Sequence, residues 1–274
     1  MTINCKGQLI DLSTPKVMGI LNITPNSFYD GGKYKDENEL LARVQKMLNE
    51  GADFIDVGAY SSKPNAEFVT EEEEIARIIP VVNLLQKHFP EIILSIDTFR
   101  AGVAKICIEN GASIINDISA GKLDDKMLEA ISKLQVPYIM MHMKGTPQTM
   151  QEHTQYEDII KEMLFYFSER IATARSLGIN DLIVDPGFGF AKTLEQNFAL
   201  MQKLELFQML ELPLLVGISR KSMIYKTLET NAEMALNGTT ILNTIALTKG
   251  AKILRVHDVK EAVECVRLFK KLDQ

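Results

Sequence analysis

The chain has 274 residues, of which 46% are apolar and 24% are charged, a composition typical of a folded globular protein. Its formal net charge of −6 argues against a nucleic-acid or anionic-membrane partner, because both favour basic proteins, although a locally basic pocket could still bind a small anion. The three cysteines are few, odd in number and without a CxxC pair, which argues against a disulfide framework or a zinc knot.

No apolar run approaches the roughly 20 residues that are needed to span a bilayer. The first residues, Met1–Leu12, carry Lys6 and Asp11 and lack the apolar stretch of a signal peptide. We therefore expect a cytoplasmic protein with no membrane partner. No linker or change of composition divides the sequence, so we expect one domain over residues 1–274.

Short apolar runs alternate with longer amphipathic stretches along the chain, after a first segment, Thr2–Leu12, that could form a hairpin. Near-continuous apolar runs are typical of strands buried on both faces of a parallel sheet. The predicted strands are Val17–Asn22, Phe54–Ala59, Ile92–Asp97, Ser113–Ile118, Tyr138–Met143, Leu182–Asp185, Leu214–Ser219 and Lys252–His257. Predicted helices include Glu37–Asn49, a helix capped by Thr70 with four glutamates in its first turn, Ile159–Leu177, Leu194–Leu210, Ala232–Thr248 and Val259–Leu272.

A weak internal repeat supports this alternation. Glycine precedes an apolar run that ends in a polar residue at Gly51, Gly111, Gly178 and Gly250, as expected where a helix ends and a strand begins. Eight such units fit the ~250 residues typical of a (β/α)8 TIM barrel, with the N-terminal β-hairpin closing its bottom. The alternative is an open doubly wound sheet, but neither GxGxxG nor GxxxxGK[ST] occurs.

Polar or ionisable side chains end all eight predicted strands. One aspartate at such a place could simply cap a helix, but a full ring at the carboxyl ends, where barrels carry their active sites, predicts a binding site. The ring consists of Asn22, Asp56, Asp97, Asn116, His142, Asp185, Ser219 with Lys221, and Arg255 with His257. For His142 a structural role remains as plausible as a catalytic one.

The ring divides into two sets. Asp97, Asn116 and Asp185 could hydrogen-bond the edge of a flat, nitrogen-rich ring such as a 2-amino-4-oxopteridine. Arg255 and a protonated His257, helped by Asn22, Ser62 and Lys63, could bind phosphate oxygens, while Lys221 could serve either set. Two turn-rich loops, 24–32 and 61–66, follow the first two strands and are expected to cover the site; Phe28 would be unusual in a loop that only faced solvent.

At these residues the chain resembles the dihydropteroate synthase family. The matching segments run in order over nearly the whole chain: Met18-Gly-Ile-Leu-Asn-Ile-Thr-Pro-Asn-Ser-Phe-Tyr-Asp-Gly-Gly32, Ser95–Thr98, Ile115–Ile118, Met141–Thr149, Asp185–Phe190, Gly217–Ser222 and Arg255–Asp258. The resemblance implies a (β/α)8 barrel that joins 6-hydroxymethyl-7,8-dihydropterin diphosphate to 4-aminobenzoate, the amine that sulfonamides mimic, and releases diphosphate. It also implies Mg²⁺ as the metal and a homodimer.

The resemblance assigns residues to three subsites. The pterin falls on Asp97, Asn116, Asp185 and Lys221, with Met140 and Arg255 packed on its ring. The diphosphate falls on Asn22, Arg255, His257, Ser62 and Lys63, and Asn22 is the expected magnesium contact. The 4-aminobenzoate falls on Phe28, Pro64, Phe190, Lys221 and Ser219. The expected catalytic residues are Asp30, which could accept the amine proton, with Asp185, Lys221, Arg255 and His257 around the pterin and the leaving group.

One loop departs from the family. The chain has Ser61-Ser-Lys-Pro64 where the family commonly has Ser-Thr-Arg-Pro, so the contact at Lys63 keeps its charge but loses the two-pronged guanidinium. Two other functions stay open. A pterin-binding methyltransferase would share the barrel and the acid and amide contacts but would not need the Arg255–His257 corner. A paralogue that binds pterin without turnover is the non-enzymatic alternative.

Overall fold

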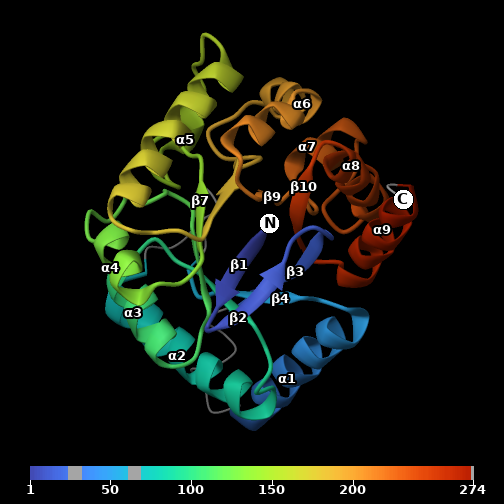
Figure 1. The fold of residues 1–274 in the computed structure, drawn as a ribbon. Helices are drawn as coiled ribbons and strands as arrows, with labels where there is room; N and C mark the ends of the chain where they lie inside the picture. The colour runs from blue at the N-terminus through green and yellow to red at the C-terminus, as the bar shows by residue number, and fades with distance from the viewer. Residues whose placement is uncertain (24–32, 61–68, 273–274) are drawn as a thin grey trace.

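The protein is described by a computed structural model that covers residues 1–23, 33–60 and 69–272. Figure 1 looks along the axis of a ring of helices that surrounds a closed barrel of parallel strands, with a two-stranded antiparallel hairpin across its centre. The barrel order is β10-β3-β4-β5-β6-β7-β8-β9, so neighbouring strands follow the chain and the last strand pairs with the first barrel strand. The predicted (β/α)8 barrel with an N-terminal hairpin is confirmed.

The barrel strands are short and the helices between them are longer. The strands are β1 Thr2–Cys5, β2 Gln8–Asp11, β3 Lys16–Asn22, β4 Phe54–Gly58, β5 Leu94–Asp97, β6 Ile114–Asp117, β7 Tyr138–Met141, β8 Leu182–Asp185, β9 Leu214–Val216 and β10 Ala251–Val256. The α-helices are α1 Lys33–Glu50, α2 Glu71–His88, α3 Ala101–Glu109, α4 Met127–Leu134, α5 Ile159–Ser176, α6 Leu194–Gln202, α7 Ser222–Thr227, α8 Leu236–Thr248 and α9 Val259–Leu272. Two 3₁₀ helices, Met150–Glu152 and Leu204–Leu210, also occur among the described residues.

Local signals account for where several helices begin and end. Thr70 caps α2 through a reciprocal capping box with Glu73, and the four glutamates lie in the first turn, where the helix dipole favours negative charge. The four glycines of the repeat, at 51, 111, 178 and 250, all adopt the left-handed conformation that ends a helix. The predicted helix Leu194–Leu210 is in fact α6 followed by the 3₁₀ segment, and α3, α4 and α7 were not predicted.

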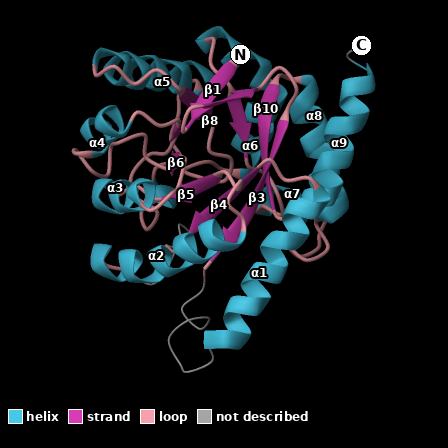
Figure 2. Cartoon of the chain, turned by 60° about the horizontal axis from the view of Figure 1, so that its bottom comes forward, coloured by secondary structure: helices cyan, strands magenta, loops and turns pink. Residues whose placement is uncertain are grey.

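The bottom of the barrel is an apolar plug. Ile3, Cys5 and Leu12 from the hairpin pack against a layer of inward side chains from the barrel strands, which includes Met18, Phe54, Ile114, Ile139, Ile183, Leu215 and Ile253. Figures 1 and 2 show the hairpin lying against the barrel from this end. The hairpin therefore closes one end of the barrel, and a site inside it can open only at the other.

The second face of each strand packs against the helices. Val17, Ile55, Ile96, Ile115 and Val184 belong to the large core between the barrel and the helical ring, because alternate side chains of a strand point to opposite faces. This alternation fixes which residues of each strand point inward. No helix in the described residues is long and apolar enough to cross a membrane.

Candidate active site

A layer of four polar side chains lies on top of the apolar plug. Two residues beyond Phe54, Ile114, Ile183 and Ile253, the inward positions of β4, β6, β8 and β10 are Asp56, Asn116, Asp185 and Arg255. In this fold, side chains from alternate strands fill the interior in layers that are normally apolar. A layer of two acids, an amide and a guanidinium at the carboxyl ends is therefore a candidate active site.

The Arg255 guanidinium joins three strands inside this site. Its Nε donates to Asp56 Oδ2 at 2.6 Å, and its Nη2 donates to Asp97 Oδ2 at 2.7 Å. Asn116 Nδ2 also donates to Asp56 Oδ2, at 3.0 Å, and Asn116 is the register neighbour of Asp97. Burial raises the pKa of Asp97 to about 7, against the opposing effect of Arg255.

Asp185 and Lys221 form the opposite side of the layer. Asp185 is buried and its Oδ1 accepts a hydrogen bond from the Gly187 amide at 2.7 Å. Burial raises the pKa of Asp185, while the nearby Lys221 acts in the other direction. Burial lowers the pKa of Lys221 to about 8, opposed by Asp185. Lys221 Nζ donates to the Phe188 carbonyl and lies 4.8 Å from the centre of the Phe190 ring, so Lys221, Phe190 and Asp185 are brought together.

His257 and Ser219 meet beyond the ends of β10 and β9. Ser219 Oγ accepts from the His257 amide at 3.1 Å and lies 3.0 Å from His257 Nδ1. Partial loss of hydration, followed by the charge of Arg255, lowers the pKa of His257 to about 4. The ring is therefore neutral near pH 7, which contradicts the expected protonated histidine. In the tautomer where the serine hydroxyl donates to Nδ1, the ring proton is on Nε2, which can donate to an anion.

Asn22 ends β3 beside the same site. It is exposed, it pairs in register with Gly58 of β4, and no side chain in the described residues hydrogen-bonds it. A Cβ built on Gly58 would lie 3.4 Å from Asp97 Cβ and 3.7 Å from Asn22 Oδ1. The glycine thus leaves open the space between Asn22 and Asp97.

The prediction that Met140 packs on the ligand is wrong. Met140 is fully buried in the outer core with Tyr138 and Val184, so its side chain points to the helices. Met141 is the register neighbour of Asp185 and clusters at the mouth with Ile118, Met143 and the partly buried Phe190. Met141 is therefore the methionine that lines the site.

The chain is similar to known proteins over nearly its whole length. The family model described as pterin binding enzyme matches residues 18–257. Dihydropteroate synthase from Escherichia coli K12 is 44% identical over 272 residues, which cover 98% of this chain and 96% of that protein. The chain belongs to the dihydropteroate synthase family. Members of this family are transferases.

Solved structures of dihydropteroate synthases have the same fold. A Yersinia pestis dihydropteroate synthase in complex with a sulfonamide drug matches with a TM-score of 0.92 and 41% identity, over 100% of this chain and 99% of that one. A Xanthomonas albilineans dihydropteroate synthase with 4-aminobenzoic acid matches with a TM-score of 0.90 and 35% identity, over 99% of this chain and 98% of that one.

Part of the predicted dihydropteroate synthase site lies outside the described residues. The loops 24–32 and 61–68 contain five predicted site residues, so the structure does not test them: Phe28, Asp30, Ser62, Lys63 and Pro64. The remaining predicted residues, Met140 excepted, surround the mouth of one barrel. The methyltransferase alternative would not have needed the corner of Arg255, Ser219 and His257 that the structure contains.

Lys192 was not predicted as part of this dihydropteroate synthase site. Its ammonium is buried and all three of its hydrogens have acceptors: His142 Nδ1 at 3.2 Å, the Gly187 carbonyl at 3.0 Å and the Phe190 carbonyl at 2.9 Å. It therefore fixes the loop after β8, which carries Phe190. The only sequence signal was a lysine within an otherwise small and apolar stretch after Asp185.

A second unpredicted contact joins the last two loops of the barrel. Arg220 forms a two-pronged ion pair with Asp258, with Nε and Nη2 each 2.8 Å from a carboxylate oxygen. Its Nη1 donates to the Ala232 and Glu233 carbonyls. Because Arg220 precedes Lys221 and Asp258 follows His257, this pair holds the two functional residues in a fixed relation.

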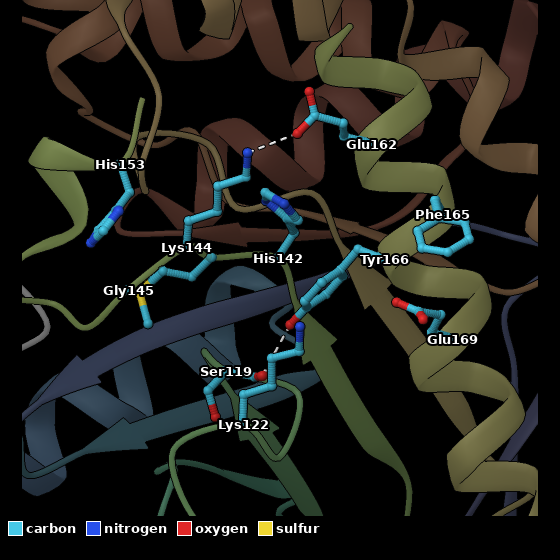
Figure 3. Close-up of a pocket in the computed structure, with 11 residues that line it drawn as sticks. Ser119, Lys122, His142, Lys144, Gly145, His153, Glu162, Phe165, Tyr166 and Glu169 are labelled. Atoms are coloured by element: carbon cyan, nitrogen blue, oxygen red, sulfur yellow. Dashed lines mark hydrogen bonds and ion pairs between the residues drawn. The ribbon is translucent and has the colours of Figure 1, made fainter. Parts of the chain in front are cut away.

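His142 points away from the mouth. Its ring packs edge-on to Tyr166 of α5 at 4.8 Å, and burial lowers its pKa well below the usual range, so it is a neutral structural residue. Behind it lies a cavity of about 480 Å³ on the helical side of the barrel. Figure 3 shows Lys144 reaching Glu162 across this cavity, and Lys122 and Glu169 also line it. Its mixed charges select no class of ligand.

Proposed function

We propose that this member of the family condenses 6-hydroxymethyl-7,8-dihydropterin diphosphate with 4-aminobenzoate to form 7,8-dihydropteroate and diphosphate. One observation carries the proposal: Asp97, Asn116 and Asp185 line the same barrel mouth as Arg255, Lys221 and His257. Carboxylate and amide oxygens suit the N–H edge of a reduced pterin, and the cationic groups suit its diphosphate.

The reaction exchanges one bond at the pterin methylene carbon for another. The carbon–oxygen bond to diphosphate breaks, its electron pair leaves with the diphosphate, and the reduced pterin delocalises the positive charge that develops. The amine nitrogen of 4-aminobenzoate then bonds to the carbon and loses a proton. Arg255 and the Nε2–H of neutral His257 would stabilise the departing anion, while Asp97 and Asp185 would hold the ring and offset its positive charge.

Phe190 and Lys221 would frame the aromatic amine, since the Lys221 ammonium already lies over the Phe190 ring. Ser219 would act mainly through His257, whose Nδ1 it contacts. Asp30 remains our candidate for accepting the amine proton, with Phe28 and Pro64 closing over the amine and Ser62 and Lys63 over the diphosphate. Their closure would exclude water, which would otherwise convert the cation to an alcohol.

Among the described residues, the groups at this site suit magnesium as an ion carried by the diphosphate. No group of three or more His, Cys, Asp or Glu side chains that could hold a metal occurs among the described residues. Asn22 offers one amide oxygen that has no partner among the described residues, which suits Mg²⁺ that takes its other ligands from phosphate and water. When bound, Mg²⁺ would neutralise charge on the leaving diphosphate; Asn22 would hold it.

The proposed function is tested with purified protein, the pterin diphosphate, 4-aminobenzoate and Mg²⁺, followed by chromatographic detection of dihydropteroate and an assay of released diphosphate. We expect the two products in equal amounts, with release of diphosphate dependent on the amine. Binding of the pterin diphosphate without product would instead support the paralogue that lacks turnover, and would overturn the proposal.

We also propose a homodimer that forms through the last helices. Of the described residues, five large apolar side chains are exposed on or beside neighbouring helices at the end of the chain: Leu228, Met234, Ile241, Leu268 and Leu272. Exposed apolar surface of this kind is typical of a protein interface. Sedimentation should give a dimer, and the double substitution Ile241→Glu/Leu268→Glu should give a folded monomer; a wild-type monomer at assay concentrations would contradict this.

We propose a cytoplasmic location because the cysteines form no disulfides. Cys5, Cys107 and Cys265 are all free and buried. Free thiols without disulfide partners are typical of proteins from reducing compartments. Fractionation of cells with an antibody against the chain should recover it with the cytoplasmic fraction.

A further inference from the structure

Asp56 is the one member of the polar layer to which the proposed reaction gives no task. Its side chain is fully buried, in β4, below the mouth. Its Oδ2 accepts two hydrogen bonds, from Asn116 Nδ2 at 3.0 Å and from Arg255 Nε at 2.6 Å. A buried acid is retained at a cost in desolvation, and a position in the barrel interior is more commonly apolar, so its presence calls for a role.

The bond to Asn116 fixes which end of that amide faces the ligand. An ionised carboxylate accepts hydrogen bonds and cannot donate them. Asn116 must therefore turn its NH₂ group towards Asp56, which leaves its Oδ1 for the ligand. The Asn116 oxygen and the carboxylate oxygens of Asp97 and Asp185 then form a set of hydrogen-bond acceptors. Such a set is complementary to a ring edge that carries several N–H groups.

The same carboxylate oxygen also orients Arg255. Asp56 holds the Nε side of the guanidinium while Asp97 holds Nη2 at 2.7 Å, so two neighbouring strands fix the plane of the group. No described residue accepts a hydrogen bond from Nη1. A planar cation held in this way offers its remaining donors to an anion without loss of side-chain freedom on binding.

We propose that Asp56 is a positioning residue that makes the pterin subsite selective for a donor-rich ring edge, by setting Asn116 as an acceptor and fixing Arg255. In this proposal Asp56 acts through these two side chains and not through a bond of its own to the substrate. The inference rests on the proposed function, because it names the structural basis of selectivity at that same site.

Asp56→Leu removes the shared acceptor. Leucine accepts no hydrogen bond, so Asn116 Nδ2 and Arg255 Nε both lose the oxygen to which they donate. Asn116 is then free to turn its NH₂ group to the pterin, which places donor against donor. We expect KM for the pterin diphosphate to rise about tenfold or more, while KM for 4-aminobenzoate at saturating pterin diphosphate changes less than about twofold.

Asp56→Asn is the rescue by a conservative substitution. Its amide oxygen can take the place of Oδ2 and accept from both Asn116 Nδ2 and Arg255 Nε, while its NH₂ group takes the place of Oδ1, to which no described residue donates. We expect KM for the pterin diphosphate to lie much closer to the wild-type value than in Asp56→Leu. An Asp56→Asn variant no better than Asp56→Leu, with both folded by circular dichroism and thermal melting, would contradict the acceptor argument.

Ser95→Ala provides the matched control. Ser95 is the register neighbour of Asp56, is equally buried, and its Oγ has no hydrogen-bond partner, so the substitution removes a polar group without touching Asn116 or Arg255. Both KM values should stay within about twofold of wild type. If wild-type protein makes no dihydropteroate, the proposed function fails; if wild type is active and Asp56→Leu has a wild-type KM for the pterin diphosphate, this inference alone fails.

Discussion

At the scale of single residues, burial changes which groups carry charge. Loss of hydration shifts the pKa of Lys221, Asp97 and His257, and the charge of Arg255 acts on all three. The residue types of this site could be predicted from the sequence because they end strands. Their protonation states could not, since they depend on distances between side chains of different strands.

The pKa of Lys221 leads to a prediction about pH. Because burial lowers this pKa to about 8, the ammonium is charged below that pH and neutral above it. We expect kcat/KM for the pterin diphosphate, which reports groups of the free enzyme, to fall as pH rises through about 8. Lys221→Met should have a lower kcat/KM that no longer falls in this range. An unchanged alkaline limb in the variant would assign the titration to another group.

The face of β7 on which Met140 lies could not be predicted from the sequence either. The run Tyr138–Met143 is apolar throughout, so it has no alternation from which the inward face can be read. A shift of one residue moves a side chain from one face of a strand to the other, and only the register of Met141 with Asp185 decides the matter.

At the scale of elements, the loop after β8 depends on one buried ammonium. Gly187, Gly189 and Ala191 have positive φ, and for the alanine this is a conformation that is rarely held without support. Lys192 supports it by donating to the Gly187 and Phe190 carbonyls, and Phe190 in turn lies against Lys221. The strand and the helix on either side were predicted from apolar patterns. The loop between them is ordered by long-range polar contacts that leave no such pattern.

Lys192→Met should therefore loosen this loop. The substitution keeps the length of the side chain but leaves His142 Nδ1 and two carbonyls without their buried donor. We expect a loss of about 2–4 kcal/mol in the free energy of unfolding, and a KM for 4-aminobenzoate that rises more than KM for the pterin diphosphate. Denaturant melts and steady-state kinetics measure the two effects.

Lys144→Met is the comparison for that variant. Lys144 lies on the same side of the barrel and pairs with Glu162 at 2.8 Å, but its side chain is one-third exposed. An ion pair of this kind contributes at most about 1 kcal/mol. Equal losses of stability in the two variants, or an unchanged KM for the amine in Lys192→Met, would remove the role given to Lys192.

At the scale of the whole molecule, stability and catalysis are separated along the barrel axis. The hairpin and the apolar plug lie at one end of the barrel. The polar layer lies two residues further along the strands, towards the other end. The barrel could be predicted because eight apolar runs and the repeated glycines agree. The role of the hairpin as a plug was also predicted, whereas α3, α4 and α7 were missed because they are short and lack strong caps.

Leu12→Ala tests this separation. Leu12 is fully buried in the plug, and removing a buried leucine side chain typically costs about 2–5 kcal/mol in the free energy of unfolding. We expect that loss in a urea melt, with both KM values close to wild type at a temperature where the variant is folded. Leu9→Ala on the same hairpin, where the side chain is 69% exposed, should change stability by less than about 0.5 kcal/mol.

The pairing of β10 with β3 has a consequence for biosynthesis. Lys16 and Val17 lie beside Ile253 and Leu254, so the two strands that close the barrel are separated by almost the entire sequence. While the polypeptide emerges from the ribosome, one edge of β3 stays without its neighbour until the last strand is made, and open strand edges recruit other chains. A nascent chain that stalls before residue 251 would therefore expose two unpaired strand edges, one on each side of the incomplete barrel, and other chains could pair with them.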